Sequence, residues 1–329
     1  MFISKRDLEL INEAPPHKEL VELFIATLDR EPTTIKSYSG TLRRYLNYLD
    51  EIGVDKPMDA DVIKYKKHLK DEKITVNKES EKKRGSASIQ RTVVVLRQFY
   101  KWCGDDHDYY PNIARGLHGE KVKAEFRRKH LTLEQAADLI DKANELKDNS
   151  IIDLRNCVLV NLLLFTGMRT IEASRADRND IYKSTINEKT YLSIQGKGRD
   201  EKDESVLISD YLLGLINEYL EKRNDKFEPL FIEHSKNRNG GRLTTSTISK
   251  AIKKLLKLIG INQKEITAHS LRHTFATTAK ELGISLEELQ ARLRHKSGDT
   301  TQRYNHYDER ENSVVELKVE EAIRNHVKK

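Results

Sequence analysis

The stretch SIIDLRNCVLVNLLLFTGMR, residues 150–169, is apolar on nearly every face when it is wound as a helix. A helix that is hydrophobic all round is a buried one. Gly167 follows the last apolar residues, and glycine commonly ends a helix because it adopts the left-handed conformation at little cost. The stretch therefore predicts a central, buried helix that ends at Gly167 and presents Arg169 just beyond its end.

Helical patterns lie on both sides of this stretch. Upstream, LTLEQAADLIDKANEL (131–146) begins with Thr132 as a candidate N-cap. In TYLSIQGKGRDEKDESVLIS (190–209) the apolar period changes to two around a glycine-containing tip, which predicts a β-hairpin. A C-terminal helix within 312–329 could pack on its own domain or dock on a neighbouring protomer. Further helices are expected at 209–223, 244–259, 270–282 and 285–294.

Residues 16–117 read as an all-helical bundle of about four helices with apolar positions at three- and four-residue steps. One of these helices occupies 33–52, with Thr33 and Thr34 as candidate N-caps, and others lie at 59–72 and 86–103. The periodicity stops at HGEKVKAEFRRKH, which is basic and poor in apolar residues. We predict a mostly α protein with a small β-sheet, divided into an N-terminal helical domain at 1–118, a basic linker at 119–130 and a C-terminal domain at 131–329.

Length and composition agree with a folded protein of two domains, because 329 residues exceed the usual size of one core. No run of eighteen apolar residues is present, and the first residues lack the apolar stretch of a signal peptide. The two cysteines, Cys103 and Cys157, are far apart with apolar neighbours, which favours reduced, buried thiols. These features predict a cytoplasmic protein with no membrane association.

The charge distribution points to a polyanionic partner more than the net charge of +7 does. Between Lys78 and Cys103 there are seven Lys and Arg against two Glu. Between Glu120 and His130 there are five against two. Basic residues clustered beside an apolar helix pattern are typical of a helix whose back is core and whose front contacts phosphates. Nucleic acid is the partner that this pattern favours.

A crowded polar stretch, HKSGDTTQRYNHYDER at 295–310, fits no helix-packing pattern. It places His295 nine positions before Tyr304 and adds Tyr307. A tyrosine that attacks a phosphodiester needs help to lose its proton, because its unperturbed pKa is about 10. The transition state gathers negative charge that arginine forks match well, and the leaving 5′ oxygen needs a proton from Lys or His. A site for this chemistry therefore needs Tyr, Arg, Lys and His together.

The chain supplies these residue types where they can converge. Arg169 follows the end of the buried helix, and Lys197 lies between two glycines at the hairpin tip, where a phosphate can approach closely. His269 and Arg272 are three positions apart on one face of a helix, near an N-terminal end that favours anions. The predicted catalytic set is Arg169, Lys197, His269, Arg272, His295 and Tyr304.

Each of these residues also has a purely structural explanation. Arg169 could pair with Glu172 one turn further along, and Lys197 alone could be a solvated turn residue. His269 and His273 have the spacing of a metal pair, but the stretch HSLRH lacks the glutamate of a zinc protease, and no third ligand is evident. The joint occurrence of the set in this order favours the catalytic interpretation.

Taken together, the motifs TGMRTIEA, GKG, HSLRHTFAT and HKSGDTTQRYNH resemble those of the tyrosine recombinases, also called phage-type integrases. The resemblance covers the C-terminal two thirds of the chain, and the preceding bundle is similar to the SAM-like core-binding domain of an Xer-like, two-domain member. It implies that Arg169 and Arg272 clamp the scissile phosphate. It also implies that Lys197 is the general acid for the leaving 5′ hydroxyl.

The same resemblance assigns the remaining roles. His269 would be a proton acceptor or phosphate ligand, His295 a phosphate hydrogen-bond donor, and Tyr304 the nucleophile, with Tyr307 packed nearby. Arg294 stands where the family usually has glycine, which leaves two possibilities, an altered local backbone or an added DNA contact. The short segment before the first bundle helix implies that no additional arm-type DNA-binding domain precedes it.

The resemblance implies site-specific DNA recombination through a 3′-phosphotyrosyl intermediate, in the integration, excision or resolution of DNA elements such as mobile elements. Because each step exchanges one phosphoester for another, neither a cofactor nor a metal ion is expected. The implied partners are double-stranded DNA with a specific recombination site, a homo-tetramer assembled on two sites, and an accessory DNA-bending protein.

Two alternatives remain at this point. One is relaxation of DNA in the manner of a type IB topoisomerase, and the other is a sequence-specific DNA-binding protein that does not cleave. The complete set argues against the second, since a protein that only binds has no use for a phenol there. For any of these functions the basic stretches should grip the DNA backbone. The predicted DNA-binding residues are Lys82, Lys83, Arg84, Arg91, Arg97, Arg127, Arg128 and Lys129.

Overall fold

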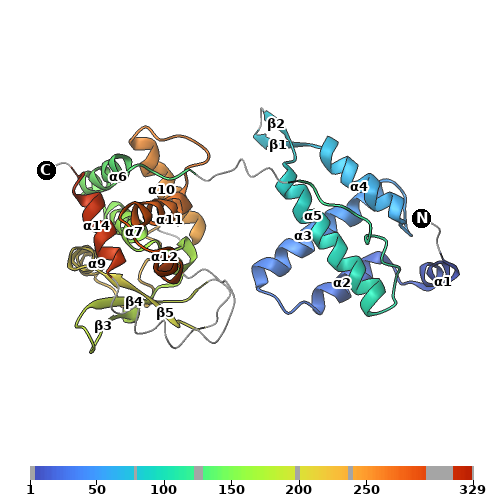
Figure 1. Ribbon diagram of the computed structural model, residues 1–329, viewed down its shortest axis with the longest axis horizontal. Coiled ribbons are helices and arrows are strands. Elements are labelled where there is room, and N and C mark those ends of the chain that lie inside the picture. The colour runs from blue at the N-terminus through green and yellow to red at the C-terminus, as the bar shows by residue number, and fades with distance from the viewer. Residues whose placement is uncertain are drawn as a thin grey trace. The chain divides into compact units, whose positions relative to one another are not determined.

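The computed structural model describes residues 4–77, 80–121, 129–196, 201–235, 240–293 and 314–327, and within 74–82 only the backbone. The chain divides into two compact units, Met1–Phe126 and Arg127–Lys329 (Figure 1). This division falls within the stretch 119–130 that we predicted as a linker. The exact limits of the predicted domains stay a prediction.

The N-terminal unit is a helical bundle with its own core. The core is formed mainly by aromatic and aliphatic side chains from α2, α3, α4 and α5. Inside it, the hydroxyl groups of Tyr45 and Tyr100 are hydrogen-bonded to each other at 2.9 Å. A two-stranded antiparallel hairpin follows α4. The elements are α1 (Lys5–Glu13), α2 (His17–Ala26), α3 (Pro32–Glu51), α4 (Asp59–Asp71), β1 (Lys73–Asn77), β2 (Ser80–Lys83), α5 (Ser86–Lys101) and the π-helical turn η1 (Trp102–Asp106).

One local prediction for this unit was wrong, and one element was missed. The N-cap of α3 is Glu31 rather than Thr33 or Thr34, because Pro32 takes the first helical position, where its fixed φ and missing N–H are tolerated. The hairpin β1–β2 was not predicted. Its second strand, SEKK, is charged and shows no apolar alternation that would reveal a strand.

The C-terminal unit is built around α7 (Ile151–Thr166), whose residues from 154 to 166 are all buried. The predicted central helix and its end are confirmed, since Gly167 adopts a left-handed φ of 61°. The predicted cap of α6 (Leu133–Leu146) is confirmed as well, because the Thr132 side chain accepts a hydrogen bond from the Gln135 backbone N–H. Among the described residues, the other helices are α8 (Thr170–Arg175), the 3-10 turn η2 (Arg178–Asp180), α9 (Asp210–Arg223), α10 (Thr245–Leu258), α11 (Ala268–Glu281), α12 (Leu286–Leu293) and α14 (Val315–Arg324).

A small antiparallel sheet lies at one edge of this unit (Figure 1). The predicted hairpin is present as β4 (Thr190–Ile194) and β5 (Glu204–Ile208), with Leu192 opposite Val206. A third strand, β3 (Ile181–Lys183), pairs with β4 and was not predicted, because three residues are too short to show a period. The fold class predicted from the sequence, mostly α with a small sheet, is confirmed.

The C-terminal helix α14 packs on its own unit. It contacts α6, α7, α11 and β5, and Val315, Val319 and Ile323 have no exposed surface. Within this single chain, the first of the two possibilities that the sequence left open is the one observed. In the described part of the chain, none of the helices has the length and apolar character needed to cross a membrane.

Candidate active site

Arg169 lies at the N-cap of α8, directly after the end of the buried helix α7. Its backbone N–H donates to Glu172 Oε2 at 2.7 Å, and its Nη1 donates to Glu172 Oε1 at 2.8 Å. Glu172 is fully buried, whereas about a quarter of the Arg169 side chain is exposed. The ion pair between Arg169 and Glu172, which was the purely structural explanation for Arg169, is therefore present. It does not use up Arg169, because a guanidinium has five N–H donors and can hold an anion with the others.

Arg272 is buried on α11 and joins two segments that are distant in the sequence. Its Nη1 donates to the Gly167 carbonyl at 2.7 Å, and its Nη2 donates to the Leu293 carbonyl. Gly167 lies two positions before Arg169, and Leu293 lies two positions before His295. The guanidinium therefore connects the backbones of two predicted catalytic motifs.

His269 lies in the first turn of α11, one turn before Arg272. Its ring meets the ring of His273 edge to face, with centroids 5.0 Å apart. Across the described ranges, no three His, Cys, Asp or Glu side chains are grouped so that they could hold a metal ion. His269 and Arg272 share one helix, and Arg272 is tied to the backbone beside Arg169. The structure thus brings three of the six predicted catalytic residues onto connected elements.

The other three, Lys197, His295 and Tyr304, lie outside the described residues, as do Arg294 and Tyr307. The residues on both sides of the Lys197 segment are described. Arg175 Nη1 donates to the Gly196 carbonyl at 3.2 Å, and Lys202 Nζ donates to both Asp177 and Asp180. These anchoring contacts were not predicted, since nothing in their local sequence shows which distant carboxylate or carbonyl each cation will meet.

The predicted DNA-binding residues differ in how available their charges are. Lys83, Arg91 and Arg97 are exposed. Arg84 instead donates from Nε and Nη2 to Glu72 Oε2 at 3.0 and 2.7 Å, and only 11% of its side chain is exposed. Lys129 donates to Gln263 Oε1 at 3.4 Å. The side chain of Lys82 and all of Arg127 and Arg128 lie outside the described residues.

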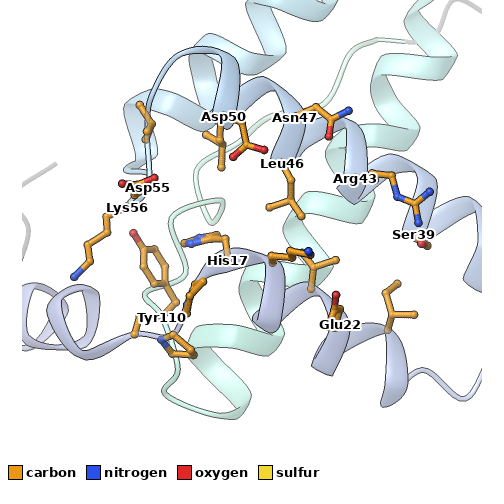
Figure 2. Close-up of a pocket in the computed structure, with 18 of the residues that line it drawn as sticks. His17, Glu22, Ser39, Arg43, Leu46, Asn47, Asp50, Asp55, Lys56 and Tyr110 are labelled. Atoms are coloured by element: carbon orange, nitrogen blue, oxygen red, sulfur yellow. The ribbon is translucent and has the colours of Figure 1, made fainter.

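A cavity of about 900 Å³ lies in the N-terminal unit between α2 and α3, and it contains none of the predicted catalytic residues. Figure 2 shows His17 and Glu22 on the α2 side, facing Leu46 and Asn47 on α3. His17 packs edge to face against Tyr110, and burial lowers the pKa of His17 to about 4. In the described residues, Nε2 of His17 has no hydrogen-bond partner. A neutral, buried imidazole is therefore part of this wall.

The sequence of this chain is similar to the sequences of known recombinases. The N-terminal SAM-like domain of phage integrases matches residues 21–105. Tyrosine recombinase XerA of Pyrococcus horikoshii is 28% identical over 290 residues, which cover 88% of this chain and 89% of the relative. Tyrosine recombinase XerD of Chlorobaculum tepidum is 27% identical over 306 residues, which cover 89% and 93%.

Solved structures show the same fold at low identity. The XerH site-specific recombinase bound to palindromic difH substrate, a post-cleavage complex, superposes with a TM-score of 0.64 at 20% identity, covering 85% of this chain and 78% of that one. A lambda integrase (75–356) dimer bound to a COC′ core site gives 0.61 at 18% identity, covering 86% and 96%. The phage integrase family pattern matches residues 129–311, more than half of the sequence, and the chain therefore belongs to the phage integrase family, the tyrosine recombinases.

Proposed function

We propose that this enzyme performs site-specific DNA recombination with Tyr304 as the nucleophile that cleaves and rejoins each strand. The phenolic oxygen of Tyr304 forms a bond to the phosphorus as the bond to the 5′ oxygen breaks. The phenolic proton goes to an acceptor, for which His269 is the candidate, and Lys197 gives a proton to the leaving 5′ oxygen. A 5′ hydroxyl of the partner strand then reverses the attack. Since one phosphoester replaces another, the exchange needs no external energy source.

The observation that supports this proposal most strongly is the pair of hydrogen bonds from Arg272 to the Gly167 and Leu293 carbonyls. They tie the α7–α8 junction, which carries Arg169, to the end of α12, beyond which His295 follows. Preorganised cations of this kind stabilise a transition state without reorganising during the reaction. Arg169, held by the buried carboxylate of Glu172, supplies a second guanidinium at the same junction.

The partners follow from the same proposal. We infer that the substrate is double-stranded DNA with a specific recombination site, that four protomers assemble on two such sites, and that an accessory DNA-bending protein assists them. A lambda integrase tetramer bound to a Holliday junction is among the structural relatives, with a TM-score of 0.61. The N-terminal domain and the basic linker at 119–130 would hold the DNA backbone, and the cytoplasm is the compartment that suits this substrate.

The test begins by finding the substrate. The full chain is incubated with supercoiled plasmids that carry random inserts, the reaction is stopped with detergent, and DNA covalently attached to protein is sequenced. A duplex of the recovered sequence, nicked near the cleavage point so that the cleaved fragment escapes, then traps the intermediate. We expect a covalent adduct that Tyr304→Phe abolishes and that Tyr307→Phe retains.

Three results would contradict the proposal. An adduct that persists in Tyr304→Phe would remove Tyr304 as the nucleophile. Relaxation of plasmids that carry a single site, with no exchange between two sites, would favour the topoisomerase-like alternative. Binding without any adduct in the unaltered chain would favour the non-cleaving DNA-binding protein.

A further inference from the structure

Four charged side chains form a connected group after α8, which we call the Asp177 cluster: Asp177, Asp180, Lys202 and Arg242. Lys202 Nζ donates to Asp177 Oδ2 at 2.6 Å and to the Asp180 carboxylate at 2.7 and 2.8 Å. Arg242 Nη2 donates to Asp177 Oδ1 at 2.5 Å. Two cations and two carboxylates therefore neutralise one another within one hydrogen-bonded network.

The Asp177 cluster is more enclosed than an ordinary surface ion pair. Only 13% of the Asp177 side chain and 11% of the Asp180 side chain are exposed. Burial opposes the ionisation of Asp177, but the hydrogen bonds from Lys202 and Arg242 outweigh it, so the pKa of Asp177 lies below its usual value. Burial likewise disfavours charged Lys202, and its bonds to the two aspartates outweigh this and raise its pKa. Multiple, partly buried pairs hold geometry better than single exposed pairs do.

The location of the Asp177 cluster indicates a structural role for it. Lys202 lies two residues before β5, on the far side of the tip that carries Lys197. On the near side, Arg175 holds the Gly196 carbonyl. Because consecutive Cα atoms are about 3.8 Å apart, fixing Gly196 also limits the positions that the Cα atom of Lys197 can take. Arg175, Asp177 and Asp180, which hold Gly196 and Lys202, all belong to the segment that starts at Arg169.

We propose that Lys202 is a positioning residue for the cleavage step, because its bonds to Asp177 and Asp180 anchor the strand that follows Lys197 to the segment that follows Arg169. This inference rests on the proposed function. Lys202 does not touch the substrate in this scheme. It fixes the chain just before β5 against Asp177 and Asp180, and we propose that this lets the ammonium group of Lys197 reach the 5′ oxygen as the phosphoryl group passes to Tyr304.

The chemistry of the leaving group provides a selective test. In normal DNA the departing 5′ alkoxide needs a proton, which Lys197 supplies as the P–O bond breaks. In a duplex with sulfur at the bridging 5′ position, the departing thiolate is stable without protonation, so the general acid is not needed. A variant that only misplaces Lys197 should therefore be slow on normal DNA and close to the unaltered chain on the sulfur-substituted duplex.

The experiment measures the rate of covalent adduct formation on both duplexes, using the sequence recovered in the plasmid selection. We expect Lys202→Met to lose about tenfold to 100-fold on normal DNA, the range that misplacement of a catalytic group produces, and to lose less than about threefold on the sulfur-substituted duplex. Lys197→Met should show the same pattern with a larger loss. Lys202→Arg, which keeps the charge, should recover most of the rate on normal DNA.

Lys222→Met is the matched control. Lys222 lies on α9 and also contacts two carboxylates, those of Asp148 at 3.1 Å and Glu218 at 3.4 Å. This variant should react like the unaltered chain on both duplexes. If Lys202→Met does not fold, Arg175→Gln, which among the described residues removes the contact with the Gly196 carbonyl, is judged by the same criterion. An equal loss on both duplexes, or no loss on normal DNA, overturns the positioning role. Absence of any adduct with the unaltered chain overturns the proposed function itself.

Discussion

Arg272 donates a hydrogen bond to the carbonyl of Gly167 at 2.7 Å, across 105 positions of the sequence. Gly167 is the left-handed residue that ends the buried helix α7. A side chain at this position would collide with Phe275, whose Cδ1 would lie 2.6 Å from an added Cβ. Two side chains of α11 therefore hold the turn between α7 and Arg169. They are the guanidinium of Arg272 and the ring of Phe275.

The first prediction concerns Arg272→Lys, which keeps the charge but cannot span both carbonyls. We expect covalent adduct formation to fall by about 100-fold or more, because the cation and the two backbone segments lose their common geometry. The free energy of unfolding should fall by about 1–3 kcal/mol, the cost of leaving a buried acceptor unpaired. Adduct trapping and urea denaturation measure the two effects. The exposed Arg115→Lys is the control, and an unchanged adduct yield in Arg272→Lys would contradict the role.

The second prediction concerns the buried His17. Its pKa is lowered to about 4 by burial, so between about pH 6.5 and pH 4 the unfolded chain takes up the proton first. Stability of the N-terminal unit should therefore fall as the pH is lowered through this window, with His17 contributing about 2 kcal/mol of loss between pH 7 and pH 5. His17→Phe should remove that part of the pH dependence.

The single tryptophan, Trp102, allows the stability of the N-terminal unit to be measured in the whole protein. Its ring lies 5.5 Å from Phe24 within the N-terminal unit, so its fluorescence follows the unfolding of that unit. Urea denaturation at both pH values gives the required free energies. The exposed His118→Phe serves as the control. Equal pH dependence in His17→Phe and the unaltered chain would show that the histidine is not the titrating group.

The third prediction concerns the C-terminal helix α14. Ile323 is completely buried against its own unit, so Ile323→Ala should lower the free energy of unfolding of the C-terminal unit by about 2–5 kcal/mol. Circular dichroism during urea denaturation measures the loss, and Leu258→Ala, at a half-exposed position, should have little effect. A loss that appears only when protomers associate would mean that α14 packs on a neighbour in solution.

The fourth prediction separates the basic residues by whether their charge is already paired. Arg97 is exposed on α5, so Arg97→Ala should reduce the slope of log affinity against log salt by about 0.9, the value for one lost phosphate contact. Arg84 is held by Glu72, so Arg84→Ala should lower stability and leave the slope unchanged. Filter binding to the recovered duplex over a range of salt concentrations measures both slopes. A reduced slope in Arg84→Ala would show that Arg84 contacts DNA.

Features set by neighbouring residues were predicted well from the sequence. The end of α7 at Gly167, the cap of α6 at Thr132 and the strands β4 and β5 all depend on local periodicity and local hydrogen bonds. Features with weak local signals were missed. The cap of α3 was misassigned because Pro32 and the two threonines compete for the same positions, and β3 was too short to reveal its period.

The sequence by itself determined the family, the two helical units and the residue types that could act on a phosphodiester, because motifs and periodic patterns are properties of short stretches. Only the tertiary structure decided that Arg84 faces Glu72, that α14 packs on its own unit, and that Arg272 meets the backbone beside Arg169. Each of these depends on which distant carbonyl, carboxylate or apolar face lies within a few ångströms. That distance is set by the packing of whole helices and by no local pattern of residues.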